Sequence, residues 1–232
     1  MGCFITDYGM EKINELTNQL LLIAFSAVRG HPDANQLMAV NSLKANCLNM
    51  FNFLSTIADD GFVSELIGAD MNKLVKCLES TNLELRLAVG ECIALLYENY
   101  IENDLDFHLF NIHELREKFN QLATDSQKSK SKKELRTQRS NFRQILHTIE
   151  GESYGPETLK FGCEKLEIDS WKMKRYYDTF CSVLGSGMNI HLSQNQLLRD
   201  IFELGTVLLD PVLNTKNTKL NTVSFCLLLI FI

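Results

Sequence analysis

Apolar residues recur at steps of three and four through the first hundred residues, which is the spacing of one face of an amphipathic helix. The pattern predicts one helix that ends at the Gly30-His31-Pro32 breaker cluster and a second that ends before Asp59. Asp33 and Gln36 have the spacing of a capping box, which predicts where the second helix begins. The apolar face expected for the first helix comprises Ile13, Leu16, Leu20, Ile23 and Ala27.

Two further helices follow the same spacing. A short third helix is expected to begin at Asp70 as its N-cap, and a fourth at Thr81, with Glu84 completing a capping box. Residues 74–98 resemble a HEAT or armadillo unit, with small Ala88 and Gly90 where helices approach closely. No strand-like alternation intervenes, so the sequence predicts successive antiparallel helices that stack as a solenoid.

The composition changes between residues 124 and 134, which read T-D-S-Q-K-S-K-S-K-K-E. A Ser/Lys-rich stretch of this kind is typical of a linker. A helix is expected from about Lys132 to Thr148. Its apolar residues are Leu135, Phe142, Ile145, Leu146 and Ile149.

Polar and apolar residues alternate after Gly151, which predicts a small β-hairpin of residues 158–162 and 165–169. A helix over residues 171–184, capped by Asp169 or Ser170, is expected to stop at Gly185-Ser186-Gly187. Residues 188–192 read as a short extended segment. Ser193 with Gln196 then predicts a last helix, which ends at Gly205.

The predicted fold class is therefore mainly α, with an armadillo/HEAT-like helical repeat domain followed by a small C-terminal α+β region. The expected domains are a helical repeat region over 1–123, a linker over 124–134 and a C-terminal domain over 135–210. An atypical apolar tail over 211–232 completes the chain. Its run Val223–Ile232 is much shorter than the roughly 20 residues of a membrane span. The tail reads either as a sticky final strand or as an aberrant end from an altered message.

The net charge of −6 argues against a surface that binds nucleic acid everywhere, although it leaves room for a local basic patch. The seven cysteines include no CxxC pair and fall mostly inside apolar stripes. They favour reduced, buried thiols of an intracellular protein over a disulfide framework or a zinc site. The first nine residues lack the basic and apolar regions of a signal peptide.

Four cations of the helix expected after the linker fall within about 60° of one another at 100° per residue. They are Lys132, Arg136, Arg139 and Arg143. This basic stripe has two interpretations: contact with phosphates or an acidic surface, or a solvated helix face in an otherwise acidic chain. The neighbouring lysines Lys128, Lys130 and Lys133 add to the first interpretation and resemble a weak nuclear localisation signal.

The sequence contains no phosphate-binding loop and no GxGxxG fingerprint. Ser186 lacks the frame of a nucleophile elbow, and His108 and His113 lack a metal-binding spacing such as HExxH. Tyr176, Tyr177 and Phe180 are more typical of core packing than of a base-stacking platform. We therefore expect no enzyme activity, cofactor, metal or small-molecule substrate.

Several ordered segments are similar to the interferon-related developmental regulators. They are L-E-L-R-L-A-V-G-E-C-I-A-L-L-Y-E, S-K-K-E-L-R-T-Q-R-S-N-F-R-Q-I-L, E-T-L-K-F-G, Y-D-T-F-C-S-V-L-G-S-G-M-N-I-H-L and L-L-R-D-I-F-E-L-G, within about residues 70–210. The resemblance implies an armadillo-like domain followed by a family-specific C-terminal domain.

The resemblance also implies non-enzymatic transcriptional co-regulators that bind corepressor and deacetylase complexes, in nucleus and cytoplasm. A ribosome-associated, translation-silencing role is the alternative that it implies. The chain departs from the family pattern at both ends, with less helical repeat at the start and no basic tail after Asp210. We expect a scaffold for protein partners, with binding of RNA or the ribosome through the basic stripe as the alternative, and no membrane partner.

Overall fold

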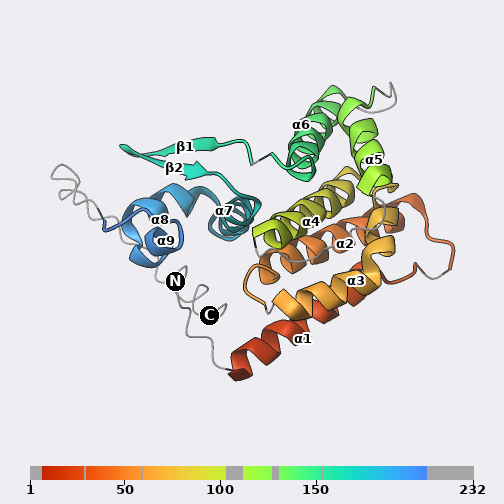
Figure 1. Ribbon diagram of the computed structural model, residues 1–232, viewed down its shortest axis with the longest axis horizontal. Helices are drawn as coiled ribbons and strands as arrows, with labels where there is room; N and C mark the ends of the chain where they lie inside the picture. The colour runs from red at the N-terminus through yellow and green to blue at the C-terminus, as the bar shows by residue number, and fades with distance from the viewer. Residues whose placement is uncertain are drawn as a thin grey trace. The chain divides into compact units, whose positions relative to one another are not determined.

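The computed structural model describes residues 7–28, 30–58, 60–102, 112–126, 131–152 and 154–207, and these are mainly helical with one two-stranded sheet (Figure 1). The predicted fold class is confirmed. The apolar tail expected over 211–232 lies outside the described residues. The helices are α1 (Asp7–Ala24), α2 (Ala34–Leu54), α3 (Asp60–Cys77), α4 (Leu83–Glu102), α5 (Ile112–Thr124), α6 (Lys132–Ile149), α7 (Trp171–Leu184), the 3₁₀ turn η1 (Gly185–Gly187), α8 (Met188–Gln194) and α9 (Gln196–Ile201); the strands are β1 (Glu157–Phe161) and β2 (Glu164–Ile168).

The chain forms two compact units. The first unit comprises residues 1–156 and 169–175, and the second comprises residues 157–168 and 176–232. The linker expected over 124–134 is the interval between α5 and α6, of which residues 127–130 lie outside the described residues. The boundaries between the two units do not lie in this linker. They follow residues 156, 168 and 175, so α6 belongs with the N-terminal helices.

Helix α4 is the centre of the first unit. It packs against α2 on one side and α6 on another, while α1 packs on α2 and α5 packs on α6. A run of its residues from Leu85 to Leu96 is almost wholly buried, which explains why its sequence is apolar around most of the helix. Neighbouring helices packed pairwise in this way agree with the predicted helical repeat.

The closest approach in this unit is at Gly90 of α4. A Cβ atom added there would lie 2.7 Å from Ile145 Cδ1 and 2.8 Å from Phe142 Cε1 of α6. The sequence predicted a close helix approach at Gly90, and the structure identifies the partner helix as α6.

The first helix buries a different face from the one expected. Leu16 and Ile23 are exposed, whereas Thr17, Leu21 and Ala24 are buried. Thr17 can be buried because its Oγ1 donates to the carbonyl oxygen of Ile13 at 2.7 Å. The buried face of α1 is therefore shifted by one residue from the expected one, and it includes a polar residue whose hydrogen bond is satisfied inside its own helix.

The predicted helix starts are confirmed where a local hydrogen bond defines them. Asp33 and Gln36 form the expected capping box of α2. Asp70 is wrong as an N-cap, because α3 begins ten residues earlier and Asp70 lies in its interior. Thr81 is wrong as well, since the Oδ1 of Asn82 accepts from the Leu85 N–H at 2.9 Å and caps α4 instead.

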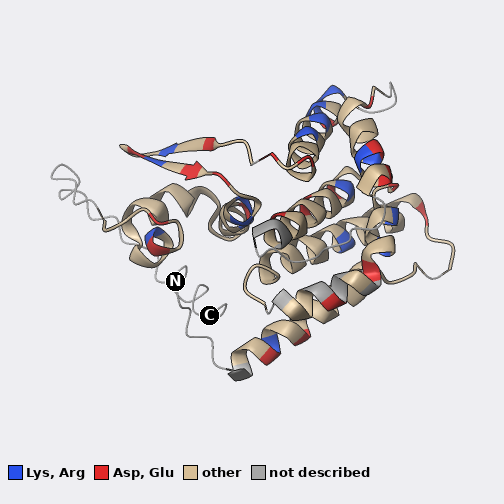
Figure 2. Cartoon of the chain, in the orientation of Figure 1, with Lys and Arg blue, Asp and Glu red and all other residues tan. Residues whose placement is uncertain are grey.

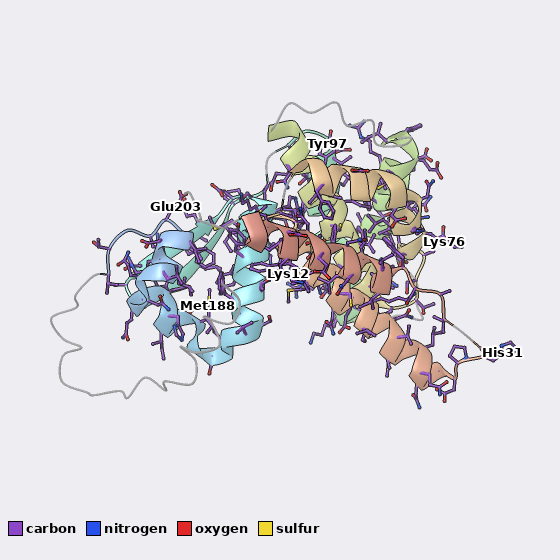
Figure 3. The ribbon with its side chains drawn as sticks, turned by 90° about the horizontal axis from the view of Figure 1, so that it is seen from below. Lys12, His31, Lys76, Tyr97, Met188 and Glu203 are labelled. Atoms are coloured by element: carbon purple, nitrogen blue, oxygen red, sulfur yellow. The ribbon has the colours of Figure 1, made fainter. Side chains whose placement is uncertain are left out.

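The second unit contains the predicted hairpin, in which β1 pairs antiparallel with β2 and Leu159 lies opposite Leu166. Gly162, at φ +56, lies in the turn between the strands. Residues 188–192 form α8 and not the expected extended segment, and Met188 (labelled in Figure 3) is buried at its start. The N-cap of α9 is Asn195 and not Ser193.

Arg199 of α9 is the largest buried group of this unit, and it is 1% exposed. Its guanidinium donates to both carboxylate oxygens of Glu164, at 2.7 and 3.1 Å, and to the carbonyl oxygens of Leu192, Leu204 and Gly205. A buried charge is tolerated when its hydrogen bonds are satisfied in this way. Arg199 therefore ties the hairpin to the loop after α9.

Aromatic packing completes the second unit. The rings of Tyr177 and Phe180 meet the ring of Phe202 edge to face, at centroid distances of 6.4 and 6.0 Å. Burial raises the pKa of the Tyr177 phenol to about 12, with further contributions from Cys181 and nearby carboxylates. These contacts fit the packing role predicted for the α7 aromatic residues.

Candidate functional site

The predicted basic stripe lies on α6, and Figure 2 shows its cations along that helix. The side chains of Lys132, Arg136 and Arg143 are exposed. Arg139 is half-buried, and its Nε donates to the backbone carbonyl oxygen of Asp125. Three of the four predicted cations are therefore exposed for a ligand, and the fourth also holds the residue that follows α5.

Local sequence explains why α6 presents this face. Ser131 and Glu134 form a capping box, in which each side chain accepts a hydrogen bond from the other residue's backbone N–H. Phe142, Ile145 and Ile149 are completely buried against the other helices. The exposed side of α6 therefore carries cations, and Glu134 is occupied in the cap.

A buried polar network fixes the orientation of α6. Arg86 of α4 donates to the carbonyl oxygen of Ser80 and to the Oε1 of Gln138, both at 2.6 Å. Gln138 in turn donates to the carbonyl oxygen of Leu122 and to a carboxylate oxygen of Asp125, both at 3.1 Å. Burial lowers the pKa of the Arg86 guanidinium, while Asp125 acts in the opposite direction.

A second site lies in the first unit, where the start of α7 contacts α4 and α6. Trp171 is 3% exposed, and its Nε1 donates to the Thr148 hydroxyl of α6 at 2.8 Å. Its ring meets Tyr154 edge to face at 5.0 Å. The backbone N–H groups of Trp171 and Lys172 donate to the two carboxylate oxygens of Glu98, at 3.0 and 3.2 Å. Glu98 therefore binds the positive end of the α7 dipole.

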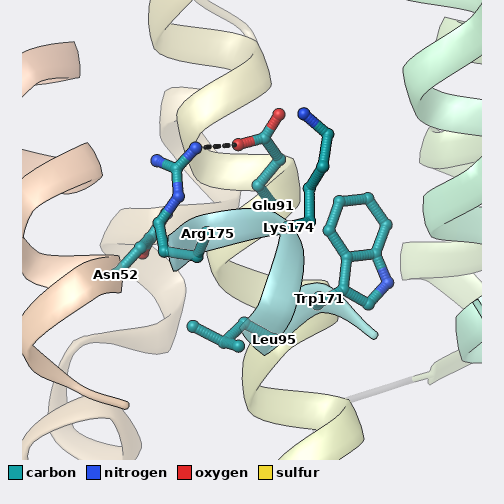
Figure 4. A pocket seen from close by; sticks show the side chains of 6 residues that line it. All are labelled: Asn52, Glu91, Leu95, Trp171, Lys174 and Arg175. Atoms are coloured by element: carbon teal, nitrogen blue, oxygen red, sulfur yellow. Dashed lines mark hydrogen bonds and ion pairs between the residues drawn. The ribbon is translucent and has the colours of Figure 1, made fainter. Parts of the chain in front are cut away.

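Arg175 provides the other half of this contact. Its guanidinium donates to a Glu91 carboxylate oxygen at 3.3 Å (Figure 4). It also donates to Asn49 Oδ1 at 2.9 Å, and the residue is 8% exposed. We call the surface that receives residues 169–175 the α2–α4 face. It comprises Asn49 and Asn52 of α2, Glu91, Leu95 and Glu98 of α4, and Thr148 of α6.

The fit at the α2–α4 face is incomplete. A cavity of about 10 Å³, the space of one water molecule, is lined by Asn52, Glu91, Leu95, Trp171, Lys174 and Arg175 (Figure 4). Asn52 is 1% exposed and donates to the Ala88 carbonyl oxygen, but its Oδ1 has no hydrogen-bond partner. Sequence reasoning did not predict this site, because it joins residues that are up to 126 positions apart.

The exposed apolar side chains are concentrated near the start of the chain. Among the described residues, seven of the ten large apolar side chains that are exposed lie between 16 and 43, on α1, α2 and the segment between them. They are Leu16, Leu22, Ile23, Val28, Leu37, Met38 and Leu43. Large exposed apolar side chains are available to contribute to a protein-binding surface.

The residues considered for catalysis or metal binding do not come together in the part of the chain that the structure describes. Ser186 is exposed in the 3₁₀ turn, and the exposed His113 pairs with Glu117 at 3.7 Å. His108 lies outside the described residues. Sequence reasoning missed one group: His147, Glu150 and Glu152, whose ligand atoms lie within 4.8 Å of one another. All three are exposed, and surface groups of this type are common without a metal.

Two further predictions concern the state of the cysteines and the absence of a membrane span. Cys47, Cys77, Cys92, Cys163 and Cys181 are free thiols, and burial raises the pKa of Cys92 strongly. Cys3 and Cys226 lie outside the described residues. None of the described helices has the length and apolar character needed to cross a membrane.

Comparison with known proteins gives a consistent result. The sequence model of the interferon-related developmental regulator (IFRD) family matches residues 1–150. The chain is 39% identical over 183 residues to Interferon-related developmental regulator 2 of Mus musculus, a match that covers 79% of the chain and 42% of that relative. It is 34% identical over 221 residues to Interferon-related developmental regulator 1 of Sus scrofa, covering 94% of the chain and 49% of the relative. The Homo sapiens relative of the same name is 36% identical over 187 residues, covering 81% and 40% respectively. The chain thus spans less than half the length of these relatives.

Proposed function

Because the chain belongs to the interferon-related developmental regulator family, we propose that it is a non-catalytic scaffold that binds protein partners in transcriptional control, corepressor complexes among them. The observation that carries the proposal is the set of exposed apolar side chains between Leu16 and Leu43 on the first unit. Burial of such side chains is the main source of affinity in protein–protein association. The proposed location is nucleus and cytoplasm.

The second candidate function is association with RNA or the ribosome through the basic stripe. Lys132, Arg136 and Arg143 are exposed on one side of α6, and they would contact phosphates. Such binding weakens steeply with salt, because each neutralised phosphate releases counterions. Burial of apolar side chains lacks this steep dependence.

Two variants of the full chain separate these functions. The apolar variant carries Leu22→Glu and Met38→Glu, at side chains that are 62% and 61% exposed, so that the fold is kept. The stripe variant carries Lys132→Gln, Arg136→Gln and Arg143→Gln, also at exposed positions. Each variant serves as the surface control for the other.

The scaffold proposal is tested by tethering each chain to a promoter through a fused DNA-binding domain and measuring reporter repression with coprecipitated deacetylase activity. The apolar variant is expected to lose both, and the stripe variant to keep both. Equal repression by the wild type and the apolar variant would contradict the proposal.

The second candidate is tested by gradient sedimentation of the same proteins at low and moderate salt. Movement into ribosomal fractions at low salt, lost in the stripe variant and at moderate salt, is the expected result for phosphate binding. Sedimentation that is unchanged in the stripe variant would exclude the basic stripe as the contact.

A further inference from the structure

The segment 169–175 differs from an ordinary core element in three ways. It is only seven residues long, and the residues on both sides of it belong to the second unit. The α2–α4 face that receives it offers mainly polar groups, namely two carboxylates, two amides and a hydroxyl. Polar groups of this kind are solvated when the face is uncovered, so the face tolerates being empty better than an apolar core would.

The recognition is chemically specific. Glu98 binds the first N–H groups of a helix, Thr148 accepts from an indole N–H, and Glu91 with Asn49 receives a guanidinium one helical turn later. Glu91, Leu95 and Glu98 lie at i, i+4 and i+7, so they form one ridge of α4. The face therefore binds the start of a helix that carries Trp at its first position and Arg four residues later.

The match with the chain's own segment is imperfect. The Asn52 Oδ1 is buried without a partner, and a water-sized cavity remains beside it. The cavity has the space of one water molecule, which could bond the Asn52 Oδ1 in its place. A helix that carries a donor at this point would bond the Asn52 Oδ1 directly.

Resting on the proposed scaffold function, we propose that the α2–α4 face is a docking site for a helical segment of a partner protein that begins Ser-Trp and carries Arg four positions after the Trp. Residues 169–175 occupy this site in cis and compete with the partner. Since a tethered segment acts at an effective concentration on the order of millimolar, the cis segment keeps partner binding weak until it is released.

The test uses the full chain and a fluorescein-labelled peptide of residues 167–180, with binding followed by fluorescence anisotropy. Arg175→Ala in the chain weakens the cis segment, and we expect it to tighten peptide binding at least about tenfold. Tenfold is the ratio that corresponds to loss of one charge-assisted hydrogen bond. Val183→Ala, at a 49% exposed side chain of the same helix but outside residues 169–175, is the matched control and should leave the affinity at the wild-type value.

Two further variants address the receiving face. Glu91→Gln, added to the Arg175→Ala chain, should remove most of the gained affinity. Glu84→Gln, at an exposed position of the same helix, should not. A peptide in which Trp171 is replaced by Ala should fail to bind any form of the chain.

Folding of each variant is checked by circular dichroism and thermal melting. If the Arg175→Ala chain does not fold, Arg175→Lys is used, since it keeps the charge near Glu91 but loses the forked contact; an intermediate gain in affinity is then expected. Peptide affinities that are equal in the folded variant and the wild type, or an absence of binding to both, would overturn the docking site. If the apolar variant still loses its partners in that case, the scaffold function survives and only the docking site fails.

Discussion

Replacing Gly90 by Ala tests the contact between α4 and α6. Two opposing effects decide the result. Ala favours a helix interior over Gly by about 1 kcal/mol. The new methyl group would lie 2.7 Å from Ile145 Cδ1 and 2.8 Å from Phe142 Cε1, both from side chains that are fully buried. Overpacking of this kind costs about 1–3 kcal/mol. We therefore expect Gly90→Ala to lower the free energy of unfolding by up to about 2 kcal/mol.

Gly68→Ala is the matched control, because Gly68 is an exposed glycine inside α3 with no atom within 4 Å of an added Cβ. This change should raise stability by about 0.5–1 kcal/mol. Urea unfolding can be followed through Trp171, the one tryptophan of the chain, which lies in the first unit. The midpoints of the two variants are expected to move in opposite directions.

A double-mutant cycle locates the cause. Ile145→Val removes the nearest atom, Cδ1, and by itself costs about 0.5–1.5 kcal/mol. Combined with Gly90→Ala, it should cost less than the sum of the two single changes, because the removed atom makes room for the new methyl group. A Gly90→Ala chain as stable as the Gly68→Ala chain would refute the close approach. Strict additivity in the cycle would show that Ile145 is not the obstacle.

Three further changes test other contacts. Asn82→Ala should cost about 1 kcal/mol by loss of the α4 cap, whereas Thr81→Ala should cost little, as measured by urea unfolding. Arg199→Ala should cost about 3–5 kcal/mol, since it leaves the Glu164 carboxylate and three carbonyl oxygens without their partner; a urea unfolding midpoint equal to that of the wild type would contradict this. Because the pKa of Tyr177 is raised in the folded chain, its phenol ionises first in the unfolded chain, near pH 10. The stability contributed by the neutral phenol should therefore be lost as the pH rises from about 10 to about 12. Tyr177→Phe should flatten that part of the stability profile, and an unchanged slope would show that Tyr177 does not cause it.

The elements that sequence reasoning placed correctly are those with local causes. The capping box of Asp33 with Gln36 and the β-hairpin after Gly151 depend on residues a few positions apart, and both are present. The wrong N-caps, Asp70, Thr81 and Ser193, are residues of the right type in the wrong place. Short polar side chains are common in the segments that precede helices. The N-cap preferences of neighbouring candidates differ too little for local sequence to choose between them.

The features of the candidate sites also differ in whether local sequence predicts them. The exposure of Lys132 and Arg143 follows from helical periodicity, so the basic stripe could be predicted. The bond from Arg139 to Asp125 depends on how α5 and α6 pack, which periodicity does not define. The bonds from the start of α7 to Glu98 cross more than seventy residues, and no local pattern in either segment indicates them.

The assignment of residues 169–175 to the first unit sets an order for folding during synthesis. The chain leaves the ribosome from its N-terminus, so α1 to α6 emerge before the hairpin and the hairpin emerges before Trp171 and Arg175. The hairpin can therefore form while Glu91 and Glu98 are still uncovered. The nascent first unit remains incomplete until residue 175 is outside the ribosome, and during that interval its α2–α4 face is open to any other helix that presents the same groups.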